Sequence, residues 1–197
     1  MKRIIPFILL LAISGGVQAQ LFKKKEKRPA EIYAEGRVPV VNNKVTFCDT
    51  IKAEGLSAAQ IETIAKEWFA QRFVKPTVIG FNLYDQEEEG TLIAKAEEYI
   101  VFKKRFFVLN RSRITYFLTI TSTDGRCIFN MSRITYWWDD EAEDGGFKLK
   151  AEECITDNAS IDQKGRLRKF EGRFRTKTID LKDTLLQDLK TRLTISK

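Results

Sequence analysis

Histidine does not occur in this chain of 197 residues. Its absence excludes Ser-His-Asp and Cys-His nucleophilic machinery, the paired-histidine helix of zinc proteases and the facial triad of non-haem iron enzymes. Any catalysis would need carboxylates, lysine, tyrosine or a cysteine activated in another way. The sequence therefore favours a protein that is not an enzyme, and it indicates no cofactor and no metal site.

Cysteine is scarce as well, with three residues in the chain. Cys48, Cys127 and Cys154 are too few and too scattered to form a disulfide framework. Cys48 and Cys127 fall in predicted strands, where small thiols are often buried. We therefore expect buried, reduced cysteines; the alternative is that an exported chain joins two of the three in a disulfide.

The apolar run at the N-terminus, Ile4 to Ile13, is too short for a stable membrane span. Lys2 and Arg3 precede it, and Val17-Gln18-Ala19 provides a small-residue cleavage site. Residues 1–19 are thus predicted to be a cleaved signal peptide; the alternative is an uncleaved N-terminal anchor. We expect an exported protein of the periplasm or outer surface of a Gram-negative-type bacterium, with no transmembrane span after cleavage.

The rest of the chain is predicted to be a charged tether followed by one domain. Residues 20–36 contain the run Lys23-Lys24-Lys25-Glu26-Lys27-Arg28, which cannot bury itself and is typical of disordered tethers. The alternative is that this run binds lipopolysaccharide phosphates or phospholipid headgroups. Residues 37–197 suffice for a single core. The mild basic excess favours solubility and weak attraction to anionic surfaces, without specifying a partner.

Residues 113–138 predict one long antiparallel hairpin. Asp124-Gly125 lies between alternating apolar runs, which is the strongest short-range signal for a type I′ turn. This turn would pair Thr123 with Arg126 and Leu118 with Met131, and the alternation specifies the register. The predicted apolar face carries Ile114, Tyr116, Leu118, Ile120, Cys127, Phe129 and Met131; the other carries Arg113, Thr115, Thr119, Thr121, Asn130 and Ser132, with Phe117 and Ile128 as apolar exceptions.

Two amphipathic helices are predicted. Ser57 and Gln60 form a capping box before the apolar stripe Ile61, Ile64, Ala65, Trp68 and Phe69. The second helix covers 181–193 and is capped by Asp180. Further strands are predicted at 44–52, after a small hairpin at Asn42-Asn43, and at 77–85, 91–102 and 147–155; residues 157–178 are predicted to be irregular. The fold class is therefore α+β: a twisted antiparallel β-sheet with two amphipathic helices packed on one face.

Three stretches carry a resemblance to a known family: Val38-Pro39-Val40-Val41-Asn42-Asn43-Lys44-Val45-Thr46-Phe47, Lys66-Glu67-Trp68-Phe69 and Thr119-Ile120-Thr121-Ser122-Thr123-Asp124-Gly125-Arg126. Over about Val38 to Tyr136 the chain resembles exported bacterial proteins described as a domain of unknown function with a TBP-like fold. Thr123-Asp124-Gly125 replaces the Lys-Asp-Gly turn usual in that family. The resemblance implies a curved antiparallel sheet with helices on one face. It implies no catalytic residues, and the fold does not imply DNA binding.

The acidic segments are weak candidates for chemistry. The loop 139–144 could hold Ca²⁺, but it lacks the glycine and the final bidentate glutamate of an EF-hand loop. We interpret it as a solvated turn, and we interpret Glu87-Glu88-Glu89 in the same way. A glycosidase would need two carboxylates in one cleft, and the sequence pattern indicates no cleft.

Two surfaces are candidates for contact with a partner. One is the uncovered sheet face, with Thr115, Phe117, Thr119 and Tyr136. The adjacent Trp137-Trp138 pair is a further hint, because one indole must be core and the other is free to be exposed. The second surface is the segment 164–177, which interleaves basic and aromatic residues. Its alternative interpretation is a solvated strand or loop whose Phe170 and Phe174 dock on the sheet. The candidate contact residues are Phe117, Tyr136, Trp138, Arg166, Arg168, Arg173 and Arg175.

The sequence thus predicts an exported, non-enzymatic binding or assembly module of the bacterial envelope. Its expected partner is a protein or an envelope glycan or lipid, and export argues against nucleic acid. Two alternatives stay open. One is a carboxylate-dependent hydrolase of envelope glycans, and the other is a binder of anionic lipid or glycan through residues 164–177.

Overall fold

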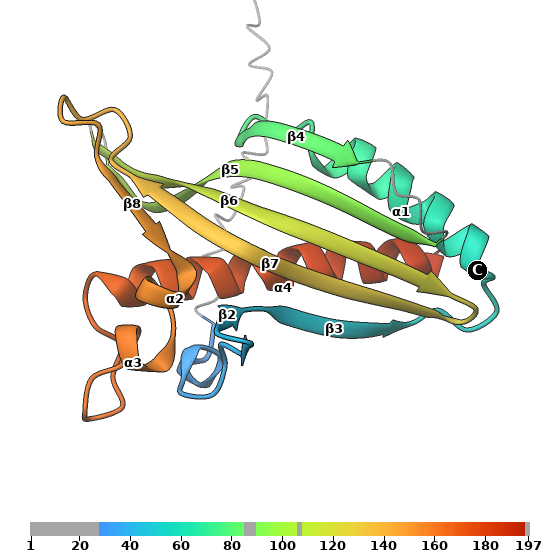
Figure 1. Ribbon diagram of the computed structural model, residues 1–197, viewed down its shortest axis with the longest axis horizontal. Helices are drawn as coiled ribbons and strands as arrows, with labels where there is room; N and C mark the ends of the chain where they lie inside the picture. The colour runs from blue at the N-terminus through green and yellow to red at the C-terminus, as the bar shows by residue number, and fades with distance from the viewer. Residues whose placement is uncertain (1–27, 85–89, 106–107, 196–197) are drawn as a thin grey trace, which may run out of the picture.

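The computed structural model describes residues 28–84, 90–105 and 108–195 (Figure 1). The predicted signal peptide and the acidic tip at 87–89 lie outside the described residues. One six-stranded antiparallel sheet with helices on one face makes up most of the described part. The core lies between the sheet and these helices, and its largest fully buried side chains include Trp68, Tyr116, Phe69, Phe129 and Phe174.

The predicted central hairpin is confirmed. Strands β6 (Val108–Thr123) and β7 (Arg126–Trp138) pair antiparallel, with Thr123 opposite Arg126 and Leu118 opposite Met131. The side chains predicted for the apolar face are buried, because alternate residues of a strand point to opposite sides of the sheet. The hairpin is the centre of the sheet, as the alternation predicts.

The turn of this hairpin differs from the predicted type I′ geometry. Gly125 has a positive φ of 71°, but Asp124 does not. The reason is that the turn is docked on the chain between β3 and α1. Gly125 donates a backbone hydrogen bond to Leu56 and accepts one from Ala53, each 2.9 Å long. The Asp124 carboxylate also accepts a 2.8 Å hydrogen bond from the backbone N–H of Ala58.

The strand order of the sheet is β3-β7-β6-β5-β4 (Figure 1). Strand β3 spans Phe47–Lys52, β4 spans Val78–Tyr84 and β5 spans Thr91–Arg105. The short strand β8 (Phe147–Lys150) pairs with the far end of β7. A separate hairpin of β1 (Val40–Val41) and β2 (Lys44–Val45) turns at Asn42 and Asn43, which both have positive φ, as a type I′ turn requires.

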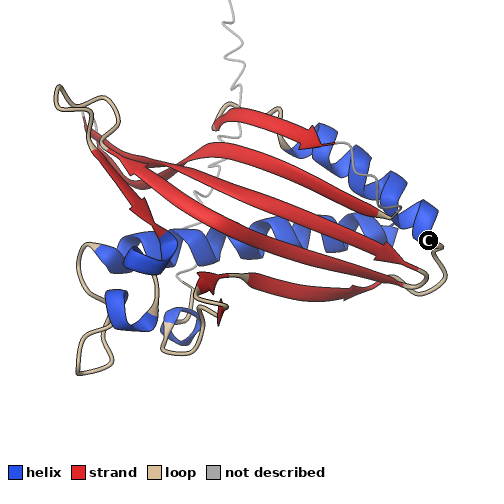
Figure 2. Ribbon diagram, viewed as in Figure 1, coloured by secondary structure: helices blue, strands red, loops and turns tan. Residues whose placement is uncertain are grey.

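Helices α1 (Ala58–Arg72) and α4 (Glu171–Ile195) both lie behind the strands in the view of Figure 2. The capping box of α1 is confirmed: Ser57 Oγ accepts from the backbone N–H of Gln60, and the Gln60 side chain accepts from that of Ser57. Ile61, Ala65, Trp68 and Phe69 are buried as predicted. The α+β class, with a twisted antiparallel sheet and two amphipathic helices on one face, is confirmed.

Helix α4 begins ten residues before the predicted start at 181, and the prediction of an irregular segment there is wrong. The buried side of its first turns carries Phe174, Arg175 and Thr178, so a charged residue interrupts the apolar stripe. Gly172 also weakens the helical signal. It is needed because a Cβ at this position would lie 2.8 Å from the Cβ of Leu167.

The strand predicted at 147–155 is also shorter than expected. It ends at Lys150, and the chain continues as two single-turn helices, α2 (Ala151–Cys154) and α3 (Asp157–Ser160). The backbone N–H of Lys150 donates to the Glu153 side chain at 3.1 Å, which favours a helical turn over continued extension.

Two of the three cysteines are buried. Cys127 and Cys154 are inaccessible and free, and burial raises the pKa of each thiol to about 12. Cys48 is exposed, so the expectation of its burial is wrong. The reason is the alternation along β3: Phe47 and Ile51 point to the core, and Cys48 lies between them on the other face, opposite Asn130.

The described part of the predicted tether, residues 28–36, packs on the domain. It contains the short 3₁₀ helix η1 (Ala30–Tyr33), and Arg28 forms ion pairs with Asp180 (2.7 Å) and Asp183 of α4. Arg175 donates hydrogen bonds to the carbonyl of Tyr33 (2.8 Å) and to that of the next residue. The packed domain therefore includes residues from 28 onward, rather than starting at 37 as predicted.

Candidate functional site

The sheet face opposite α1 and α4 is the larger candidate contact surface. In the central strands β5 and β6, the side chains on this face are half-buried, whereas their neighbours on the helix side are buried. We call this surface the open sheet face. Cross-strand register places on it Tyr84, Lys95, Glu97, Tyr99, Arg111, Arg113, Thr115, Phe117, Thr119, Thr135, Trp137 and Lys148.

Aromatic rings and cations alternate across four strands of the open sheet face. The Arg111 guanidinium lies 3.7 Å from the ring centroid of Tyr99, and that of Arg113 lies 5.8 Å from it. Arg113 also lies 5.0 Å from the ring centroid of Trp137, and the Lys148 ammonium lies 4.7 Å from the ring centroid of the same indole. We call these five residues the aromatic–cationic row. Each such contact is worth about 0.5–1 kcal/mol at an exposed site, so the row is held in a defined arrangement.

The acidic loop between β7 and β8 holds this row in place. Asp140 accepts hydrogen bonds from Arg113 and from the Tyr99 hydroxyl, the latter at 3.3 Å. Although desolvation acts against it, hydrogen bonding to Asp140 raises the pKa of Arg113, so the guanidinium stays charged. Glu141 pairs with Arg111 at 2.5 Å. The interpretation of this loop as a solvated turn is therefore wrong for Asp140, whose side chain is 2% exposed.

A second aromatic group lies beside the row on the open sheet face. Phe117 stacks on Tyr84, with ring centroids 6.3 Å apart and an interplanar angle of 7°, and the Arg133 guanidinium lies 5.1 Å from the Phe117 centroid. The predicted placement of Phe117 on the uncovered face is confirmed. Thr115 and Thr119, which flank it on β6, lie on the same face.

The prediction that Tyr136 lies on the open sheet face is wrong. Between the pairs Phe117–Ser132 and Thr115–Thr135, β6 has one residue and β7 has two. The extra residue is accommodated at Arg133, which has a positive φ of 51°. This β-bulge reverses the facing of all later residues of β7. Tyr136 is therefore 2% exposed, and its hydroxyl forms a 2.7 Å hydrogen bond with Thr178 of α4.

The same bulge decides between the two adjacent tryptophans. Trp137 is the indole on the open sheet face, where its Nε1 donates to the carbonyl of Gly145 at 2.7 Å. Trp138 points to the helix side, where it stacks on Phe147 at 5.9 Å and contacts the edge of Phe170 at 5.2 Å. The prediction of Trp138 as a contact residue is therefore wrong, and Trp137 lies on the open sheet face instead.

The four predicted basic contact residues lie in three different environments. Arg175 is fully buried, so its prediction as a contact residue is wrong; it donates to the carbonyl of Ile155 and pairs with Asp157, each at 2.8 Å. Arg166 is exposed but pairs with Asp162 at 2.9 Å. Its backbone N–H is the main cause that lowers the pKa of Asp162. Arg168 and Arg173 lie together at a small pocket.

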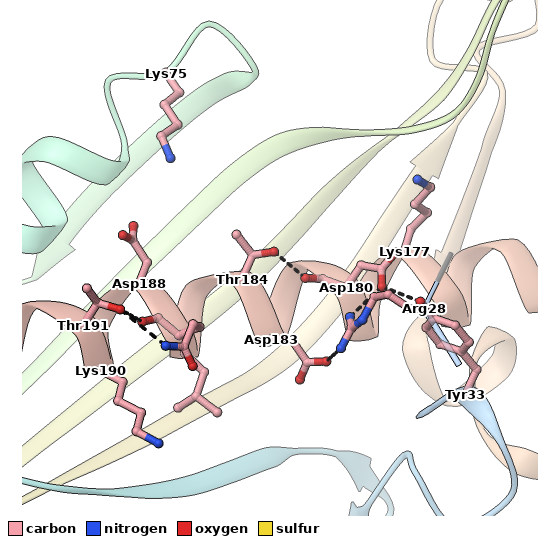
Figure 3. Close-up of a pocket in the computed structure, with 12 residues that line it drawn as sticks. Arg28, Tyr33, Lys75, Lys177, Asp180, Asp183, Thr184, Asp188, Lys190 and Thr191 are labelled. Carbon is pink, nitrogen blue, oxygen red and sulfur yellow. Dashed lines mark hydrogen bonds and ion pairs between the residues drawn. The ribbon is translucent and has the colours of Figure 1, made fainter. Parts of the chain in front are cut away.

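A groove of about 1020 Å³ runs along the outer side of α4 (Figure 3). Lys75 points toward it from the loop after α1, while Arg28 and the Tyr33 hydroxyl reach Asp180. Asp183 also lines it. Desolvation works against ionisation of Asp183, but hydrogen bonds from Lys182 and Arg28 outweigh it and lower the pKa of that carboxyl. The acid of a glycosidase needs a raised pKa, so the lowered pKa of Asp183 does not suit that role.

Sequence reasoning missed most of the aromatic–cationic row. The row forms only in the register in which β5 pairs with β6, and the sequence between these strands carries no clear turn signal. Tyr99 lies directly opposite Arg113, and Trp137 lies on the other side of it. The adjacent tryptophans were the one available signal. Within the described residues, no cluster of three or more acidic or cysteine side chains is arranged to hold a metal ion.

The open antiparallel sheet, with α1 and α4 on one face, defines an α+β protein with a TBP-like fold. Residues 47–137 match the family described as "Domain of unknown function (DUF4468) with TBP-like fold". The resemblance to this family that the sequence predicts is thereby confirmed.

Two solved structures are similar. A DUF4468 family protein from Bacteroides ovatus ATCC 8483 is 28% identical, with a TM-score of 0.76, and the similarity covers 85% of this chain and 96% of that one. A TBP-like protein from Parabacteroides distasonis ATCC 8503 is 22% identical, with a TM-score of 0.66 over 80% of this chain and 97% of that one; this likeness shows the fold alone. No curated protein matches the sequence.

In the part of the chain that the structure describes, no helix combines the length and the apolar character needed to cross a membrane.

Proposed function

We propose that the protein is a non-enzymatic binding module of the bacterial envelope and that the open sheet face is its contact surface. One observation carries this proposal: the aromatic–cationic row presents two aromatic rings and three cations in a fixed order, on a face that α1 and α4 leave uncovered. Aromatic residues and arginine are the types enriched in the centres of protein interfaces. The sequence pattern of a signal peptide supports the envelope as the place of binding.

The chemistry of the surface favours a protein partner that presents carboxylates beside apolar side chains. Arginine planes bind carboxylates through two parallel hydrogen bonds. Lys95, Arg133 and Lys148 add positive charge to the same face, and none of the three has an ion-pair partner within the described residues. Rings such as Phe117 and Trp137 supply the apolar contact area at low cost in side-chain entropy.

Site-specific photocrosslinking tests this proposal. A photoreactive phenylalanine analogue placed at Phe117 or Trp137 should give one discrete cross-linked species in the envelope fraction of the native host. The matched control is Glu67, which is exposed on α1 on the opposite side of the sheet. The same species from position 67, or no species from either sheet position, would contradict the open sheet face as the contact surface.

A companion experiment tests the role of charge. Exchanging Lys95 and Lys148 for glutamate should abolish the cross-link at Phe117, because the carboxylates of the partner would then meet like charge. A persistent cross-link in that variant would show that apolar contact alone drives binding. Circular dichroism controls for the fold, since both lysines are at least partly exposed.

A further inference from the structure

A small apolar pocket lies at the start of α4, on the helix side of the sheet. It has a volume of about 320 Å³ and is lined by Phe102 of β5 and by Leu167, Gly172 and Thr176. The Leu167 side chain is 39% exposed, although it is apolar. Phe102 packs edge-on against Phe174 at 4.7 Å, so the floor of the pocket is continuous with the hydrophobic core. We call this cavity the basic pocket, because its remaining lining residues are cations.

Three cations surround the apolar floor: Arg168, Arg173 and Lys177. None of them has a carboxylate partner within the described residues, in contrast to Arg166 and Arg175 of the same segment. Positive charge is thus concentrated at the rim and is not neutralised by the fold. A further basic residue, Lys103, follows Phe102 directly and is exposed.

The Arg173 side chain is held in place by aromatic contacts. Its guanidinium lies 5.4 Å from the ring centroid of Phe102 and 5.2 Å from that of Phe170. Its Nε is buried and has no hydrogen-bond partner. A buried donor without a partner is costly, and this donor is left unpaired within the described residues. The pocket therefore combines a preorganised cation with an apolar floor.

We propose that the basic pocket binds an anionic lipid at a membrane surface. The negative headgroup would lie among Arg168, Arg173 and Lys177, and the first part of an acyl chain would contact Phe102 and Leu167. The apolar floor favours a lipid over a soluble polyanion, because a glycan needs the cations alone. This site lies on the helix side of the sheet, so it does not rest on the open sheet face.

Vesicle cosedimentation tests the proposal with the chain from Gln20 onward. The probes are vesicles of phosphatidylglycerol mixed with phosphatidylcholine, and vesicles of phosphatidylcholine alone. We expect binding to the anionic vesicles only, weakening as salt is raised. Each basic side chain near an anionic surface contributes about fivefold. Exchanging Arg168 and Lys177 for glutamine should therefore weaken binding about 25-fold.

Two further variants separate the pocket from general attraction of a basic chain. Lys52→Gln with Arg126→Gln removes the same charge from an exposed cross-strand pair at the other end of the hairpin, and should change binding little. Leu167→Ser keeps all charge and should weaken binding about tenfold through lost apolar contact. All variants retain the lysine-rich N-terminal segment, so its contribution cancels in the comparison.

Three outcomes would overturn the proposal. If the Lys52→Gln, Arg126→Gln variant lost as much vesicle binding as the variant lacking Arg168 and Lys177, the attraction would be diffuse and electrostatic. Unchanged binding of the Leu167→Ser variant would show that charge alone acts, as for a soluble anionic glycan. Equal binding to phosphatidylcholine vesicles would show that the anionic headgroup is not recognised.

Discussion

The backbone of Arg133 determines on which side of the sheet Tyr136 lies. The positive φ of Arg133, 51°, accommodates one additional residue in β7. Tyr136 then reaches Thr178 in the core. A strand that continued in the regular register would bring Tyr136 out to the open sheet face and put Trp137 in its place inside. The composition of the aromatic–cationic row therefore depends on this single bulge.

The bulge gives a prediction about stability. Arg133→Val should lower the free energy of unfolding by about 1–2 kcal/mol relative to Arg133→Gly, because a β-branched side chain is strained at positive φ. Both variants lose the contact of Arg133 with Phe117, so their difference isolates the backbone. Urea unfolding measures it. Arg126→Val, in the same strand at ordinary φ, should be close to neutral, and an equally large effect there would contradict this account.

The buried hydrogen bond between Tyr136 and Thr178 gives a second prediction. Tyr136→Phe and Thr178→Val should each cost about 1–3 kcal/mol, because each leaves one buried hydroxyl without a partner. The double variant should cost less than the two single variants together, since it removes both hydroxyls. Urea unfolding of the wild type, the two single variants and the double variant completes this double-mutant cycle. Strict additivity would contradict a direct interaction.

Thiol reactivity gives a third prediction. At pH 8 the folded protein should react with a thiol reagent at one cysteine, Cys48, and the protein in urea at three, because Cys127 and Cys154 are buried. Cys48→Ser should leave no reactive thiol in the folded state. Reaction of two or more thiols in the native protein would contradict the burial of Cys127 and Cys154.

The same two buried thiols predict a loss of stability in alkali. Burial raises their pKa from 9.0 to about 12. Above pH 9 the unfolded chain can ionise these thiols and the folded chain cannot, so the free energy of unfolding should fall as pH rises from about 9 to about 12. Cys127→Ala should reduce this fall, as measured by urea unfolding across that range. An unchanged pH dependence would contradict the role of the thiol.

The predicted signal peptide gives a fifth prediction. N-terminal sequencing of the protein from the native host should begin at Gln20, as the cleavage pattern indicates. Ala19→Arg should block cleavage and leave the precursor in the membrane fraction. A mature protein that starts at Met1 in the cytoplasmic fraction would contradict both the signal peptide and the proposed place of binding.

The main features of the fold follow from local sequence signals. Asp124-Gly125 and the alternation around it predict the register of β6 and β7, and Ser57 with Gln60 predicts the start of α1. The bulge was missed because arginine does not favour positive φ, so Arg133 carries no signal. The early start of α4 was missed because Arg175 occupies a core-facing position that the amphipathic pattern assigns to apolar residues.

The candidate sites were less predictable because they depend on contacts between distant segments. The row requires the register of three strand pairs at once, and the basic pocket requires Phe102 of β5 to meet Leu167 and α4. The sequence identified the basic segment as a whole. It could not separate Arg175, which points inward to backbone carbonyls, from Arg168 and Arg173 at the pocket.

The docking of Arg28 on Asp180 and Asp183 also bears on the order of assembly. These partners are 152 and 155 positions apart in the chain. A ribosome makes the N-terminal end first, yet the helix that receives it follows all the strands in chain order. Residues 28–36 therefore cannot settle onto α4 until that helix has been made, and the first described part of the domain is among the last to find its final position.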